Sequence, residues 1–66
     1  MPTAFRDMQP WRRSLVVNGL TYGWLAQRTG VSPSTVESYA LGRRTPRPEW
    51  IAKAEAAITE HERTAA

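Results

Sequence analysis

Proline and glycine divide this chain into short segments, and their positions limit what it can fold into. Three prolines stand where helices can begin, because proline suits the first helical position, at which no N–H is needed: Pro10, Pro33 and Pro48. Three glycines stand where helices can end, because glycine readily takes the left-handed conformation: Gly19, Gly30 and Gly42. No alternating pattern typical of a β-strand stands out. The sequence therefore predicts an all-α fold built from short helices.

Four helices are predicted between these stops, covering about residues 9–18, 22–30, 33–41 and 48 onward. Thr21 and Ser32 serve as N-caps, since a hydroxyl at this position can accept from the unpaired amides of the first turn. The segment 42–48 cannot be helical, because each of its prolines pushes the preceding residue toward an extended conformation. Residues from Glu60 onward are expected to fray.

The chain is predicted to form a single domain. Its 66 residues are near the lower size at which folding buries enough surface, roughly 60% of what the open chain exposes. Without cysteine there is no disulfide and no thiolate zinc site, so an apolar core must hold the fold. We expect residues 1–8 to be a flexible arm, residues 9–62 the helical domain and residues 63–66 a frayed tail.

Helical spacing predicts which side chains face the core. In the first helix Trp11 is expected to pack inward, with Arg12 and Arg13 turned outward. In the second helix either Trp24 or Leu25 takes the inward place.

The composition argues against catalysis, metal binding and membrane insertion. His61 is the one histidine and is expected to be exposed and idle, so neither a catalytic dyad nor a histidine-based metal site is expected. The longest apolar run, residues 15–17, is far shorter than the roughly 20 residues that span a bilayer. We therefore expect a cytoplasmic protein that is not an enzyme, does not enter a membrane, and needs no cofactor or metal.

Charge is unevenly distributed along the chain. Residues 1–47 hold seven arginines against two acidic residues, a net charge of +5. Residues 48–66 hold two basic residues against four glutamates, a net charge of −2. Arginine grips phosphate with a planar fork of donors. A basic body of this kind suits a polyanion, and the acidic end suits a different partner.

Residues 21–42 look like a helix-turn-helix. Ala26 is small at the point where two helices cross closely, and Gly30 permits the tight turn between them. Val31 and Val36 are placed to fill the space beneath that turn. Agreement at several positions is much more specific than agreement at any single one.

Over about residues 10–58 the chain resembles the lambda-repressor-like, or Cro and C1 type, family of DNA-binding proteins. The stretch from Gly42 to Pro48, in which basic residues lead to proline, is common in that family. The resemblance implies a compact domain of four to five helices, with the helix-turn-helix at about residues 21–41. It also implies that the third helix enters the DNA major groove, usually in a symmetric dimer.

The resemblance further implies that the first residues of the third helix read base edges, here Pro33, Ser34, Glu37 and Ser38. Glu37 could accept a hydrogen bond from cytosine N4, whereas the two serines discriminate poorly between bases. The alternative for Glu37 is an ion pair with a nearby arginine on the protein surface.

Contacts with DNA phosphates are expected at the helix starts, where amides and the helix dipole favour an anion, and from the loop after the third helix. The expected residues are Thr21, Tyr22, Ser32, Thr35, Arg43, Arg44 and Arg47. Tyr22 stands where the family often has glutamine. Tyrosine can still donate to a phosphate, but the bridge that glutamine makes to the base readers is lost.

The chain shows no clear fifth helix, the element that often completes the core and the dimer contact in this family. Trp50 and Ile58 lie on the apolar stripe of the fourth helix. They are therefore expected in the core around that helix or on a dimer surface. A protein that dimerises only on DNA would fit as well.

These observations favour a sequence-specific transcriptional regulator of the Cro or small-repressor type. It would come from a phage or prophage, associate with the nucleoid and bind a double-stranded operator as a homodimer. Two alternatives stay open. One is an antitoxin-type module whose residues 48–66 bind a protein partner, and the other is an architectural or excision factor that bends DNA with little sequence preference, which the serine-rich reader face makes plausible.

Overall fold

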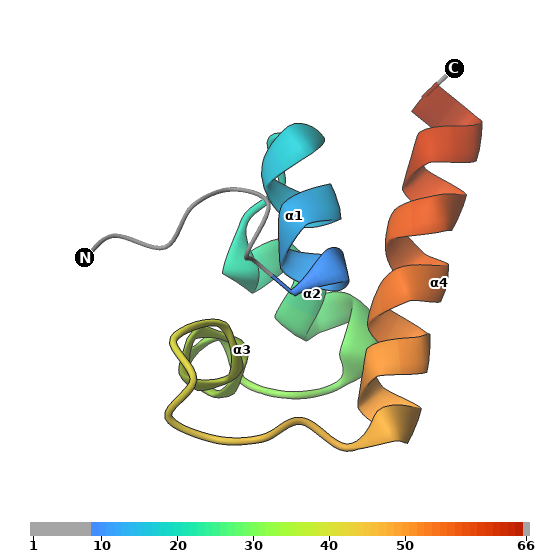
Figure 1. The fold of residues 1–66 in the computed structure, drawn as a ribbon. Helices are drawn as coiled ribbons and strands as arrows, with labels where there is room; N and C mark the ends of the chain where they lie inside the picture. Colours follow the sequence, from blue (N-terminus) through green and yellow to red (C-terminus); the bar gives the residue numbers. More distant parts are fainter. Residues whose placement is uncertain (1–8, 66) are drawn as a thin grey trace.

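The computed structural model describes residues 9–65, which form four helices joined by short connections (Figure 1). The helices are α1 (Pro10–Val17), α2 (Tyr22–Thr29), α3 (Pro33–Ala40) and α4 (Pro48–Ala65). No strand occurs within this range, and the expectation of an all-α fold is confirmed. The expected arm, residues 1–8, lies outside the described residues.

The first turns of α2 and α3 are closed by the hydroxyls that the sequence indicates. The amide of Trp24 donates to Thr21 Oγ1 over 3.1 Å, and the amide of Thr35 donates to Ser32 Oγ over 3.2 Å. At the end of α2, Gly30 adopts a φ of 77°. A Cβ there would meet nothing within 4 Å, so the turn needs glycine for its backbone conformation and not for lack of space.

The core lies where the four helices meet, and each helix contributes two or three side chains to it: Trp11, Leu15, Leu25, Ala26, Val36, Ala40, Trp50, Ala54 and Ile58. Aromatic rings join three of the helices. The ring of Trp50 in α4 lies 5.0 Å from the ring of Trp11 in α1 and 4.8 Å from the ring of Tyr39 in α3. Edge-on ring pairs of this kind contribute about 0.5–1.5 kcal/mol beyond the burial of their area. The aromatic cluster therefore holds α1, α3 and α4 together at one point.

In α2 the inward position belongs to Leu25, while Trp24 lies at the edge of the core. Leu25 is fully buried and Trp24 is half-buried. The ring of Trp24 contacts the ring of His61 at 5.5 Å, and the guanidinium of Arg28 lies 5.1 Å from its centre. The expectation of an exposed His61 is therefore wrong, because His61 is partly buried against α2.

Helix α4 is longer than the sequence predicts, and its last turns are helical as far as Ala65. Part of the expected tail, residues 63–66, is therefore helix. Two contacts with the rest of the domain hold this end: the ring of His61 packs on α2, and Asn18 Nδ2, directly after α1, donates to Glu62 Oε2 over 2.8 Å. The local sequence predicts fraying at this end because it contains no sign of either contact.

Trp50 and Ile58 lie in the core and not on an outer face of α4. Their side chains are 7% and 2% exposed. Because α1 and α2 cover the inward side of α4, neither residue has surface to offer to a second copy of the chain. The apolar stripe of α4, which the sequence assigns to the core around that helix or to a dimer surface, is filled by packing within one chain.

Removing the carboxylate of Glu62 is expected to loosen the end of α4. In E62A the hydrogen bond from Asn18 is lost, which should lower the free energy of unfolding by about 0.5 kcal/mol, since the bond is open to solvent. Hydrogen exchange of the last α4 amides should become faster. E55A is the matched control, because Glu55 is exposed on the same helix and makes no ion pair within residues 9–65. Equal exchange rates in the two variants would contradict the prediction.

Candidate DNA interface

Helices α2 and α3 form a helix-turn-helix whose turn is stabilised by a backbone hydrogen bond and by buried side chains beneath it. The amide of Val31 donates to the carbonyl of Ala26 over 3.1 Å, so the chain folds back directly after α2. Beneath the turn, Ala26 and Val36 are almost fully buried. Thr29 is buried as well, and its hydroxyl is satisfied by the carbonyl of Leu25 at 2.8 Å. One side of α3 therefore rests on α2, and the other side faces outward.

The outward side of α3 carries the four predicted base readers. Pro33, Ser34 and Glu37 are exposed, and Ser38 is half-buried. Residues three and four positions apart are neighbours on a helix, so these side chains share one face. Glu37 makes no ion pair within residues 9–65, and its carboxylate is therefore not held by an arginine of this part of the chain.

Hydroxyl groups lie at the starts of both helices. Ser32 Oγ and Thr35 Oγ1, at the start of α3, are 2.8 Å apart. One of them donates to the other, which leaves one of the two protons for a group outside the pair. At the start of α2, Thr21 is exposed, and the ring of Tyr22 packs at the edge of the core. These positions suit donors to DNA phosphates.

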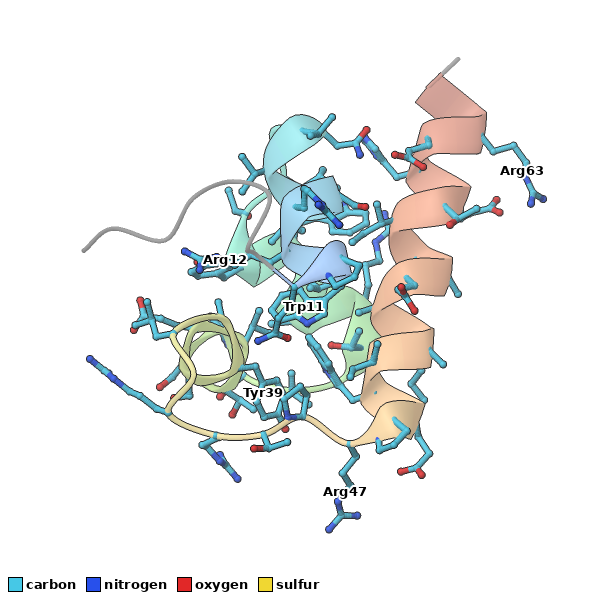
Figure 2. All side chains as sticks on the ribbon, in the orientation of Figure 1. Trp11, Arg12, Tyr39, Arg47 and Arg63 are labelled. Atoms are coloured by element: carbon cyan, nitrogen blue, oxygen red, sulfur yellow. The ribbon has the colours of Figure 1, made fainter. Side chains whose placement is uncertain are left out.

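The three arginines of the predicted phosphate contacts lie in the connection between α3 and α4. The amides of Arg43 and Arg44 both donate to the carbonyl of Ser38, over 2.9 and 3.3 Å, which ties this connection to α3. The guanidinium of Arg44 lies 5.9 Å from the centre of the Tyr39 ring, within the range of a cation–π contact. In Figure 2, Arg47 projects away from the helices. All three arginines are exposed, so positive charge follows the C-terminal end of α3.

A family model described as a helix-turn-helix domain matches residues 5–62. The chain belongs to the helix-turn-helix family. Comparison with curated proteins and with solved structures yields no match. Membership confirms the resemblance that residues 21–42 carry, and it indicates a DNA-binding regulator. Domains of this family are typically not enzymes.

The helix-turn-helix protein uses Arg12 in a way that its sequence does not indicate. Helical spacing predicts an outward Arg12, but its Nη1 donates to the carbonyl of Ala40, the last residue of α3, over 3.1 Å. Beside it, Gln9 Nε2 donates to the carbonyl of Tyr39 over 3.3 Å. The partners stand 28 and 30 positions apart, so no local pattern in the sequence could have revealed either contact.

Other kinds of site are not found in the part of the helix-turn-helix protein that the structure describes. No pocket is present there, and no three side chains that ligate metals come together. None of the four helices combines the length and the apolar character that crossing a membrane requires. The candidate site of residues 9–65 is therefore the outward side of α3 with its neighbouring hydroxyls and arginines.

Proposed function

We propose that this protein is a sequence-specific transcriptional regulator of the Cro or small-repressor type, which places α3 in the major groove of a double-stranded operator. The observation that supports this most is the outward side of α3, where polar side chains are exposed beside three exposed arginines. An α-helix fits the major groove, which is about 12 Å wide. Regulation would follow from occupation of the operator, with no chemical step and no cofactor.

The proposed contacts fall into two classes. The N-terminal residues of α3 approach base edges, as the docking of such helices requires: Pro33, Ser34, Glu37 and Ser38. Residues around them contact phosphates and set the register of the protein on the duplex: Thr21, Tyr22, Ser32, Thr35, Arg43, Arg44 and Arg47.

Binding as a homodimer that forms on the DNA is part of this proposal. Two copies whose α3 helices lie about 34 Å apart meet successive major grooves on one side of the duplex. Because Trp50 and Ile58 are buried within one chain, the contact between the copies would use other residues. The operator should then be two-fold symmetric.

The test is selection of bound duplexes from a random DNA pool at about 150 mM salt, followed by sequencing. A two-fold symmetric site with half-sites about 10 base pairs apart is the expected result. Enrichment of single, unpaired half-sites would contradict binding as a dimer but would still support sequence-specific regulation. Equal recovery of unrelated duplexes would overturn sequence-specific regulation and favour the architectural or excision factor.

The same selection assigns Glu37 to a base. With E37Q we expect one position in each half-site to change from cytosine to adenine, because a carboxylate accepts from cytosine N4 whereas an amide pairs with adenine N6 and N7. The preference at that position should change by about tenfold, within the range of one good base contact. E55Q makes the same chemical change on α4 and should leave the selected site as it is. If E37Q selects the wild-type site, Glu37 does not read a base.

Binding of a protein partner through residues 48–66 is the second candidate, and it rests on the four exposed glutamates of α4. Two of them are already engaged within the chain, since Glu62 accepts from Asn18 and Glu60 lies 3.7 Å from Arg63. The acidic surface available to a basic partner is therefore smaller than the charge count suggests. Stoichiometric co-purification of a second protein, lost on substitution of Glu49 and Glu55, would support this candidate.

A further inference from the structure

The C-terminal end of α3 is closed by two side chains of the segment that begins α1. The last four carbonyls of an α-helix have no partner within it. In α3 the final two accept from this segment: the carbonyl of Ala40 from Arg12 Nη1 over 3.1 Å, and that of Tyr39 from Gln9 Nε2 over 3.3 Å. The carbonyl of Tyr39 also accepts from the amide of Gly42 over 3.3 Å, so the bond from Arg12 is the more important of the two. We term Gln9 and Arg12 the α1 clamp. The positive charge of Arg12 also suits the negative end of the α3 dipole.

The α1 clamp is itself anchored in the core. Gln9 Oε1 accepts from Trp11 Nε1. Trp11 is 1% exposed and packs edge-on against Trp50. Gln9 is therefore held by a buried ring, and Arg12 follows Trp11 directly in the chain. A shift of α3 along its axis would have to break its hydrogen bonds with this segment.

The other hydrogen bonds of α3 are local, and its remaining contacts with the rest of the domain are made by packed side chains. Its N-terminal cap is made by its own Ser32 and Thr35. Beneath it, α3 packs on α2 through buried apolar side chains, of which Val36 is one. Apolar burial favours contact without prescribing a direction, whereas hydrogen bonds constrain both distance and angle. The α1 clamp therefore supplies side-chain hydrogen bonds that set the position of α3 relative to the rest of the domain.

From this arrangement we propose that Arg12 is a positioning residue for base readout. It fixes how deeply α3 enters the major groove and how α3 is rotated about its axis, so that Ser34 and Glu37 meet base edges. Arg12 does not itself contact DNA. The proposal rests on the function proposed above. Base readout needs side chains placed for paired hydrogen bonds, whereas charge contacts with phosphates tolerate displacement. Loss of the clamp should therefore reduce the preference for the operator more than the affinity for DNA in general.

Burial supports a role for Arg12 away from the DNA backbone. Its Nε atom is buried, and its Nη1 is bonded to Ala40. One edge of the guanidinium is therefore closed to a phosphate. In contrast, Arg43, Arg44 and Arg47 are exposed, as a phosphate contact requires.

The test compares affinity for the selected duplex with affinity for an unrelated duplex of equal length, at several salt concentrations. R12M keeps most of the aliphatic stem and removes the donors and the charge, and R12Q is made in parallel in case R12M does not fold. R63M is the matched control for the loss of one positive charge, since Arg63 lies at the far end of α4 from α3 (Figure 2). The folded fraction of each variant is determined by circular dichroism, and affinities are expressed per folded molecule.

For R12M and R12Q we expect the ratio of the affinity for the selected duplex to that for the unrelated duplex to fall about tenfold. This loss corresponds to one base contact. The slope of log affinity against log salt should equal that of R63M. A ratio equal to that of wild type would overturn the proposal and leave Arg12 with a role in stability alone. A slope lower by about 1 than that of R63M would overturn it as well, because Arg12 would then contact a phosphate. If the wild-type protein bound both duplexes equally well, the proposed sequence-specific function would be wrong, and this inference would fail with it.

Discussion

Replacement of the three arginines after α3 by alanine should weaken binding to the selected duplex about 100-fold at about 150 mM salt. R43A/R44A/R47A removes three exposed cations from the connection between α3 and α4. Each phosphate contact releases condensed counterions and contributes about 0.9 to the slope of log affinity against log salt. The slope should therefore fall by about 2.7 for three contacts. Affinity for unrelated duplexes should fall by the same factor, because phosphates carry no sequence information.

Titration of a labelled duplex at several salt concentrations measures both the affinity and its dependence on salt. The control is K53A/R63A, which removes two exposed cations of α4 and leaves the α3–α4 connection intact. This control should lose little affinity and keep its slope, since exposed charges beyond a Debye length, about 8 Å at physiological salt, act weakly. If the control lost as much affinity per charge as the triple variant, binding would follow net charge, and the surface around α3 would not be the DNA site.

The helix boundaries could be predicted because each is decided by residues next to it. Pro10, Pro33 and Pro48 are the first residues of α1, α3 and α4. Gly30 takes the positive φ that ends α2. Proline fixes its own φ, and a glycine stop needs no distant partner, so a local pattern carries all the information that such an end requires.

Contacts between distant residues could not be predicted in this way. The helix pattern placed Arg12 outward because it shows only which residues share a face of α1, and not that the end of α3 lies beside that face. The bond between Asn18 and Glu62, which helps to extend α4, joins residues 44 positions apart. For the same reason the sequence leaves the apolar stripe with Trp50 compatible with a core and with a dimer surface.

The candidate site was predictable in part. The order of residues in a helix-turn-helix determines which of them share the outward side of α3, and Ser34 and Glu37 are exposed there. Ser38 is half-buried, and the amides of Arg43 and Arg44 turn back onto its carbonyl. The path of that connection depends on how α3 and α4 pack, which residue spacing does not specify.

Replacement of Trp11 by alanine is expected to unfold the protein at 25 °C. Trp11 is 1% exposed, packs against the ring of Trp50 and donates to Gln9. Removal of a buried tryptophan costs about 3–5 kcal/mol. A single core in a chain of this size supplies about the same amount in total. W11A should therefore lack the cooperative thermal transition of the wild type in far-ultraviolet circular dichroism.

Trp24 provides the matched control, because the same substitution there removes the same side chain from a half-buried position. W24A loses the contacts with His61 and Arg28 at the edge of the core and should stay folded, with a lower melting temperature. Cooperative melting of W11A close to wild type would show that the aromatic cluster does not hold α1, α3 and α4 together. The anchoring of Gln9 through the Trp11 ring would then not matter for stability either. The stability of the fold and the position of α3 thus depend on the same buried ring.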